Sequence, residues 1–86
     1  MKLNRYFINQ RLGEETLLVP AGKAQFSGIV RGNKTFGAVL DLLKTETTEA
    51  QIVASIRARF DAPEGVVEQD VHAALAQLRE IGALDE

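Results

Sequence analysis

Residues 66–82 read VVEQDVHAALAQLREIG, and their apolar side chains repeat at the spacing of one face of a helix. The members of this stripe are Val67, Val71, Ala74, Leu75, Leu78 and Ile81. Gly82 follows the stripe, at the position where a glycine commonly ends a helix because it adopts a left-handed backbone without strain. The pattern predicts a helix over about residues 66–81 that buries one of its faces.

Two further apolar stripes precede this helix. Asn33 is a good N-cap, and the stripe behind it predicts a helix over about residues 34–43, with Phe36, Val39, Leu40 and Leu43 on one face. Thr48 and Gln51 have the spacing of a capping box, in which each side chain bonds the free N–H group of the other residue. The stripe that follows predicts a helix over about residues 48–60, with Ile52, Val53, Ile56 and Phe60 on one face.

Towards the N-terminus the pattern changes from helix to strand. Arg5–Ile8 and Thr16–Val19 are rich in aromatic, β-branched and leucine residues, and Gly13 lies between them, so a β-hairpin is the simplest arrangement. The second run ends at Pro20, which has no N–H group for a sheet ladder. Gly28–Arg31 adds a possible third strand.

Strands followed by a run of helices predict an α+β fold. We expect a small N-terminal antiparallel β-sheet of two or three strands within about residues 5–31, followed by three helices, in an arrangement that resembles a winged helix-turn-helix. A length of 86 residues leaves room for one domain, residues 1–86.

The composition is that of an ordinary globular protein, with 45% hydrophobic and 26% charged residues. Cysteine is absent, which excludes disulfides and thiolate metal sites and suggests a reducing compartment. The N-terminus lacks the apolar run of a signal peptide, and the apolar runs are too short to span a membrane. We therefore expect a cytoplasmic protein with no membrane partner.

Residues for catalysis are scarce. His72 is the single histidine, and no second histidine or cysteine exists to complete a metal site with it. The glycines between residues 28 and 37 match neither phosphate-binding motif, GxxxxGK[ST] or GxGxxG. The sequence predicts a non-catalytic protein without cofactor or metal.

The charges are unevenly distributed, with seven basic and three acidic residues before Thr45, and three basic and nine acidic ones from Thr45 onward. The third predicted helix carries three acidic residues, Glu68, Asp70 and Glu80, and one basic residue, Arg79. A recognition helix of this charge would repel phosphate, so nucleic acid is disfavoured. A winged-helix regulator that binds DNA or a regulatory protein stays open as the alternative function.

A small sheet has two edges whose backbone N–H and C=O groups are unpaired, and an extended peptide can add a strand there. If Gly28–Arg31 is an edge beside the third helix, a peptide can lie between the two. The same edge also permits pairing with a second copy of the chain, as a homodimer or structural subunit.

In order and spacing, the whole chain resembles the PqqD family, whose fold is also called the RiPP precursor-peptide recognition element. The matching segments are Leu17–Pro20, Ile29–Asn33, Leu40–Leu43 and Thr48–Val53, followed by Asp70, Val71, Leu75, Leu78, Gly82 and Leu84. Two residues depart from the family pattern. Gly32 replaces a common leucine before the cap, and Val39 replaces a larger residue.

The resemblance implies a chaperone that binds the leader segment of a ribosomally made precursor peptide by β-strand addition. It also implies that the chaperone presents this peptide to a modifying enzyme, often a radical SAM enzyme. Carried over position by position, the resemblance places strand pairing at Ile29, Val30 and Arg31. On the third helix it implies contacts at Asp70, Val71, Ala74 and Leu78. Arg31 has a second reading, because a charge on an edge strand also protects against aggregation.

Overall fold

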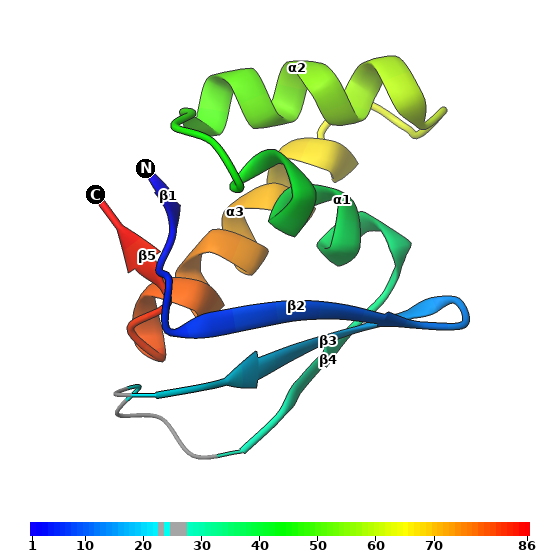
Figure 1. The fold of residues 1–86 in the computed structure, drawn as a ribbon. Coiled ribbons are helices and arrows are strands. Elements are labelled where there is room, and N and C mark those ends of the chain that lie inside the picture. Colours follow the sequence, from blue (N-terminus) through cyan, green and yellow to red (C-terminus); the bar gives the residue numbers. More distant parts are fainter. Residues whose placement is uncertain (23, 25–27) are drawn as a thin grey trace.

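The computed structural model describes residues 1–22, 24 and 28–86. Strands β2 (Phe7–Leu12), β3 (Glu15–Pro20) and β4 (Val30–Gly32) form an antiparallel sheet in the order β2-β3-β4. Helices α1 (Lys34–Leu42), α2 (Glu49–Arg59) and α3 (Val66–Glu80) follow (Figure 1). The predicted α+β class and the three predicted helices are therefore confirmed.

The β2–β3 hairpin is longer than the sequence pattern indicated. The ladder runs from the pair of Phe7 and Pro20 to the pair of Leu12 and Glu15, leaving a two-residue turn. Gly13 in this turn has a φ of +63°, which is the left-handed region that such short turns require. The first strand was predicted at residues 5–8, and this is wrong at both ends. Polar residues of β2 continue the ladder because backbone pairing does not need apolar side chains.

The third strand lies later than predicted. It covers Val30–Gly32 and pairs with β3 through Leu18 and Val30, Leu17 and Arg31, and Thr16 and Gly32. Ile29 was predicted in this strand but precedes it, and its side chain is 60% exposed.

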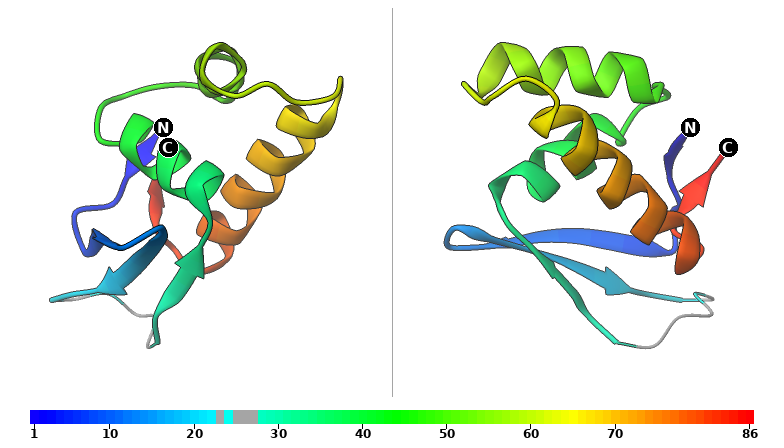
Figure 2. Two further views of the ribbon diagram at one scale, coloured as in Figure 1. Left: turned by 90° about the vertical axis from the view of Figure 1, so that its right-hand side faces the viewer. Right: turned by 180° about the vertical axis from the view of Figure 1, so that it is seen from behind.

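A second sheet was not predicted. Strands β1 (Lys2–Leu3) and β5 (Leu84–Asp85) pair antiparallel, so the two ends of the chain lie side by side (Figures 1 and 2). The N–H of Asn4 also donates to the carbonyl of Ala83 at 2.7 Å. Strands of two residues have no detectable period, so the sequence pattern gave no signal for this pairing.

The helix ends follow the capping chemistry read from the sequence. Asn33 Oδ1 accepts a hydrogen bond from the Phe36 N–H at 3.0 Å, so Asn33 is the N-cap of α1. Thr48 and Gln51 form the full capping box of α2. Beyond α3, Gly82 has a φ of +75° and ends the helix as predicted. Gly65, which also has a positive φ, precedes α3 without a side-chain cap.

Helix α1 occupies the centre of the molecule. It packs on the sheet with one side and on α2 and α3 with the other, and α2 forms the layer farthest from the sheet (Figures 1 and 2). The core is one cluster drawn from all these elements. Its fully buried large side chains are Leu18, Val39, Leu40, Leu43, Ile52, Ile56, Val71, Leu75 and Leu78. This packing fixes α3 relative to the sheet through α1.

Candidate functional site

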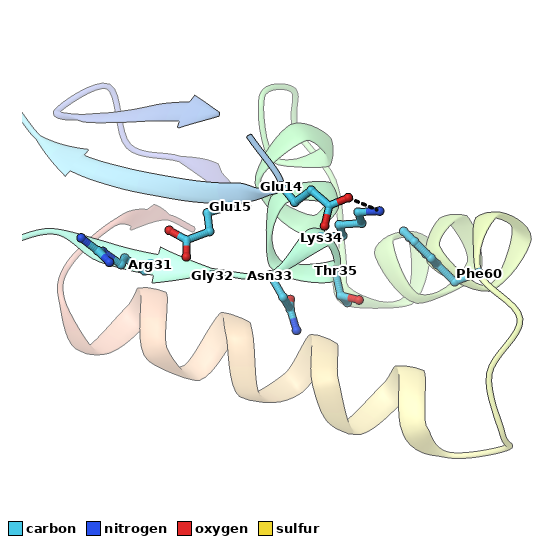
Figure 3. Close-up of a pocket in the computed structure, with 8 residues that line it drawn as sticks. All are labelled: Glu14, Glu15, Arg31, Gly32, Asn33, Lys34, Thr35 and Phe60. Atoms are coloured by element: carbon cyan, nitrogen blue, oxygen red, sulfur yellow. Dashed lines mark ion pairs between the residues drawn. The ribbon is translucent and has the colours of Figure 1, made fainter. Parts of the chain in front are cut away.

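Strand β4 is an edge of the three-stranded sheet. It pairs with β3 on one side, and the order β2-β3-β4 leaves its other side without a strand partner among the described residues. Alternate residues of a strand direct their N–H and C=O groups to opposite sides, so part of the β4 backbone is available to a further strand. Helix α3 runs beside this edge in the opposite direction (Figures 2 and 3).

A groove of about 320 Å³ lies between β4 and α3. Its β4 and α1 side is lined by Arg31, Gly32, Asn33, Thr35 and Phe36, and its α3 side by Asp70, Ala73, Ala74 and Gln77. The α3 residues are spaced i, i+3, i+4 and i+7, so they share one face of the helix. The open strand edge and this helix face therefore line the same groove.

Phe36 explains why glycine stands before the helix cap. A Cβ atom added at Gly32 would come closer than 3.0 Å to the Phe36 ring. The ring thus occupies the space that a leucine at this position would fill. Phe36 and Ala74 are each 8% exposed, so they form a largely apolar floor at the groove.

The two walls of the groove carry opposite charges. Arg31 on β4 and Asp70 on α3 are both exposed and both line the groove. Neither side chain takes part in an ion pair within the described part of the chain. Both charges are therefore available to a ligand in the groove.

The sequence-derived site residues divide into two groups. Arg31, Asp70 and Ala74 come together in the groove. Val71 and Leu78 are fully buried in the core, and Val30 is 8% exposed, so these three side chains lie beneath the groove. The Val30 backbone is still part of the β4 edge. Ile29 is exposed ahead of β4, outside the groove lining.

Sequence reasoning missed Ala73 and Gln77 on α3. Their signal was the helical spacing itself, since they stand three and seven residues after Asp70. Thr35 and Phe36 also line the groove and were not predicted, because no local sequence pattern indicates that they lie there. They reach the groove because α1 begins directly after β4.

A larger hollow of about 680 Å³ adjoins the groove (Figure 3). It lies between the hairpin turn, the start of α1 and the end of α2, and is lined by Glu14, Glu15, Arg31, Gly32, Asn33, Lys34, Thr35 and Phe60. Lys34 Nζ lies 3.5 Å from Glu14 Oε1, as the dashed line in Figure 3 marks.

Other candidate chemistry is sparse in the described residues. His72 is exposed, with its Nδ1 at 3.3 Å from Glu49 Oε2. Across the residues that the structure describes, no three metal-binding side chains of the histidine, cysteine, aspartate or glutamate type gather in one place. No described helix is long and apolar enough to cross a membrane.

These observations define a small α+β domain with an open sheet edge beside a helix. The family described as "Coenzyme PQQ synthesis protein D (PqqD)" matches residues 14–84, which is most of the chain. The chain belongs to the PqqD family.

The fold has a counterpart among solved structures. The structure titled "TbiB1 in Complex with the TbiA(beta) Leader Peptide" aligns with a TM-score of 0.74 at 21% sequence identity, covering 99% of this chain and 100% of that one. This likeness shows that the two proteins share a fold. No curated protein matches the chain.

Proposed function

We propose that this protein is a RiPP recognition element that binds the leader segment of a ribosomally made precursor peptide. The observation that carries the proposal is the groove in which the open edge of β4 faces α3. Membership of the PqqD family supports it, as does the shared fold with TbiB1, a protein solved with a leader peptide.

In this proposal the leader adds a strand to β4 and lies against α3. Main-chain hydrogen bonds to the β4 edge supply affinity that tolerates many sequences, while the side chains of the groove supply selectivity. Arg31 and Asp70 bind charged or polar groups of the leader from opposite walls, and Ala74 leaves room for an apolar side chain.

The remaining site residues act by position. The side chains of Val30, Val71 and Leu78 are buried, so they hold β4 and α3 at the distance that a strand needs. Val30 contributes to leader binding through its backbone, as part of the β4 edge. Ile29 is exposed next to β4 and contacts the leader where it leaves the strand.

The protein then acts as a non-catalytic chaperone in the cytoplasm. It presents the bound peptide to a modifying enzyme, for which the family resemblance favours a radical SAM enzyme. A homodimer through the β4 edge would compete with the leader for the same backbone groups, and light scattering with and without peptide distinguishes the two.

Calorimetric titration with leader segments encoded by short reading frames beside the gene tests the proposal. We expect micromolar binding, about −8 kcal/mol, and amide shifts in NMR spectra at β4 and α3. Asp70→Lys weakens this binding because it removes the negative wall of the groove. Glu80→Lys is the matched control, since Glu80 is an exposed α3 residue outside the groove lining.

Contrary outcomes are equally defined. Amide shifts confined to residues away from β4 and α3 would contradict strand addition in the groove. Salt-dependent binding of duplex DNA, without binding of any leader, would favour the winged-helix regulator instead.

A further inference from the structure

We propose that the groove continues beyond the end of β4 into a second subsite around Phe60 and Arg59, which binds an apolar residue next to an acidic residue of the same peptide. This inference rests on the proposed function and adds a sequence preference to it.

The first step is the continuity of the surface. The groove beside α3 and the hollow of about 680 Å³ share four lining residues, Arg31, Gly32, Asn33 and Thr35. The two spaces therefore meet along the end of β4 and the start of α1, where a peptide that follows β4 reaches the hollow. Figure 3 shows this hollow extending from Arg31 at the strand to Phe60 at the end of α2.

The second step is a further hollow beyond the first. A more enclosed space of about 250 Å³ shares Glu14, Lys34 and Phe60 with the larger one. Its other lining residues are Arg11, Gly13, Thr16, Ala38, Asp41 and Arg59. Phe60 lines both spaces and so stands at their junction.

Phe60 supplies the apolar part of the subsite. Its N–H donates to the Ile56 carbonyl at 2.9 Å, which fixes the residue as the C-cap of α2. The side chain packs partly against the core, and the rest of it faces the two hollows. A half-buried ring that lines a hollow buries further apolar area when an apolar side chain docks on it.

Arg59 supplies the charge. The other cations of the enclosed hollow are already paired, Lys34 with Glu14 at 3.5 Å and Arg11 with Asp41 at 3.4 Å. Arg59 lies in the last turn of α2 and makes no ion pair within the described part of the chain. The hollow thus holds one uncompensated positive charge beside Phe60, which favours a carboxylate in the ligand.

The probe for this subsite is a displayed library of random twelve-residue peptides, selected against the wild-type protein. We expect the enriched peptides to share an apolar residue followed or preceded by aspartate or glutamate, at one end of the segment that pairs with β4. Replacing that acidic residue by its amide weakens binding up to about fivefold, the scale of one exposed ion pair.

Protein variants then assign the preference to the subsite. Arg59→Glu lowers the affinity for the acidic peptide by at least the same factor and leaves the affinity for its amide version unchanged. The effects of the protein substitution and of the peptide substitution are therefore not additive. Lys2→Glu makes the same charge change at an exposed residue of β1 and leaves both affinities unchanged. Phe60→Ala, checked for folding by circular dichroism, lowers the affinity for peptides with the apolar residue.

The outcomes separate this inference from the proposed function. Selected peptides that respond to Asp70→Lys but neither carry an acidic residue nor respond to Arg59→Glu overturn the second subsite and leave leader binding intact. Selection of no peptide overturns both.

Discussion

At the scale of single residues, α1 approaches β3 closely at Gly37. A Cβ atom added there would come closer than 3.0 Å to Thr16 Oγ1, and Thr16 is 3% exposed. Gly37→Ala should therefore lower the free energy of unfolding by roughly 1–3 kcal/mol, the usual cost of overpacking. This is opposite to the gain of about 1 kcal/mol that alanine brings over glycine in an unobstructed helix. Urea unfolding at pH 7 measures the difference.

The partner variant identifies the cause of this loss. In the Thr16→Ala background the obstructing hydroxyl is gone, so adding Gly37→Ala should cost much less there than in the wild type. Additive losses from the two substitutions would show that the contact is not the source of the effect.

Single residues also show where sequence reading succeeds and where it stops. The caps at Asn33 and Thr48 were predictable because their bonds are made within three residues along the chain. Val71 and Leu78 were not separable from surface residues of the site, since an apolar residue on α3 belongs equally to a core stripe and to a peptide contact. Only the packing of α3 on its neighbours shows that both are fully buried.

At the scale of secondary-structure elements, α2 depends on its capping box. Thr48 accepts from the Gln51 N–H, and the Gln51 side chain accepts from the Thr48 N–H, each at 3.2 Å. Thr48→Ala leaves the Gln51 N–H unpaired by the protein and should cost about 1 kcal/mol of stability. Thr45→Ala, at an exposed residue before the cap, is the control. Equal midpoints of thermal unfolding for the two variants would contradict the role of the cap.

An ion pair joins α2 to α3. Arg57 donates to Glu68 from two of its three guanidinium nitrogens, Nε to Oε1 at 3.2 Å and Nη2 to Oε2. This hydrogen bond lowers the pKa of Glu68 below its ordinary value of 4.5. Folding therefore favours the ionised carboxylate, so the stabilisation is fully present above pH 4.5 and is lost as the pH falls through the lower folded pKa.

The pH dependence of a variant checks this sign. Glu68→Gln should be less stable than the wild type at pH 7, and the difference should disappear as the pH is lowered below 4.5 towards the folded pKa. Glu64→Gln, at an exposed residue outside the ion pairs of the described residues, should show no such convergence. A difference between wild type and Glu68→Gln that stays constant down to low pH would contradict the ion pair as its origin.

Helices were easier to predict than strands for a physical reason. The apolar stripe of α3 runs over four turns, so its limits were fixed to about one residue. Strand β4 has only three residues, and its pairing depends on β3, not on its own pattern. The same holds for the two walls of the groove. The sequence predicts the α3 wall, whereas the position of the β4 wall depends on the register of β4 against β3.

At the scale of the whole molecule, the sheet of β1 and β5 connects the two ends of the chain. Its partners are Lys2 with Asp85 and Leu3 with Leu84, which no local sequence pattern relates. Ala83, just before β5, is fully buried, and its N–H donates to the Leu78 carbonyl at 2.8 Å, which ties β5 to the end of α3. The helix wall of the groove is thus anchored at its C-terminal end by the N-terminal strand.

Deletion of residues 83–86 should therefore destabilise the protein by roughly 2–4 kcal/mol, through lost apolar burial and lost backbone hydrogen bonds. Hydrogen exchange should show the largest loss of protection in the last turn of α3, next to Leu78, because the deletion removes the contacts that hold this turn. Deletion of Glu86 alone removes only the exposed pair with Arg79 and is the matched control, with an unchanged unfolding midpoint. If both deletions behaved alike, the anchor would lie elsewhere, and α3 would be held against the sheet by α1 and α2 alone.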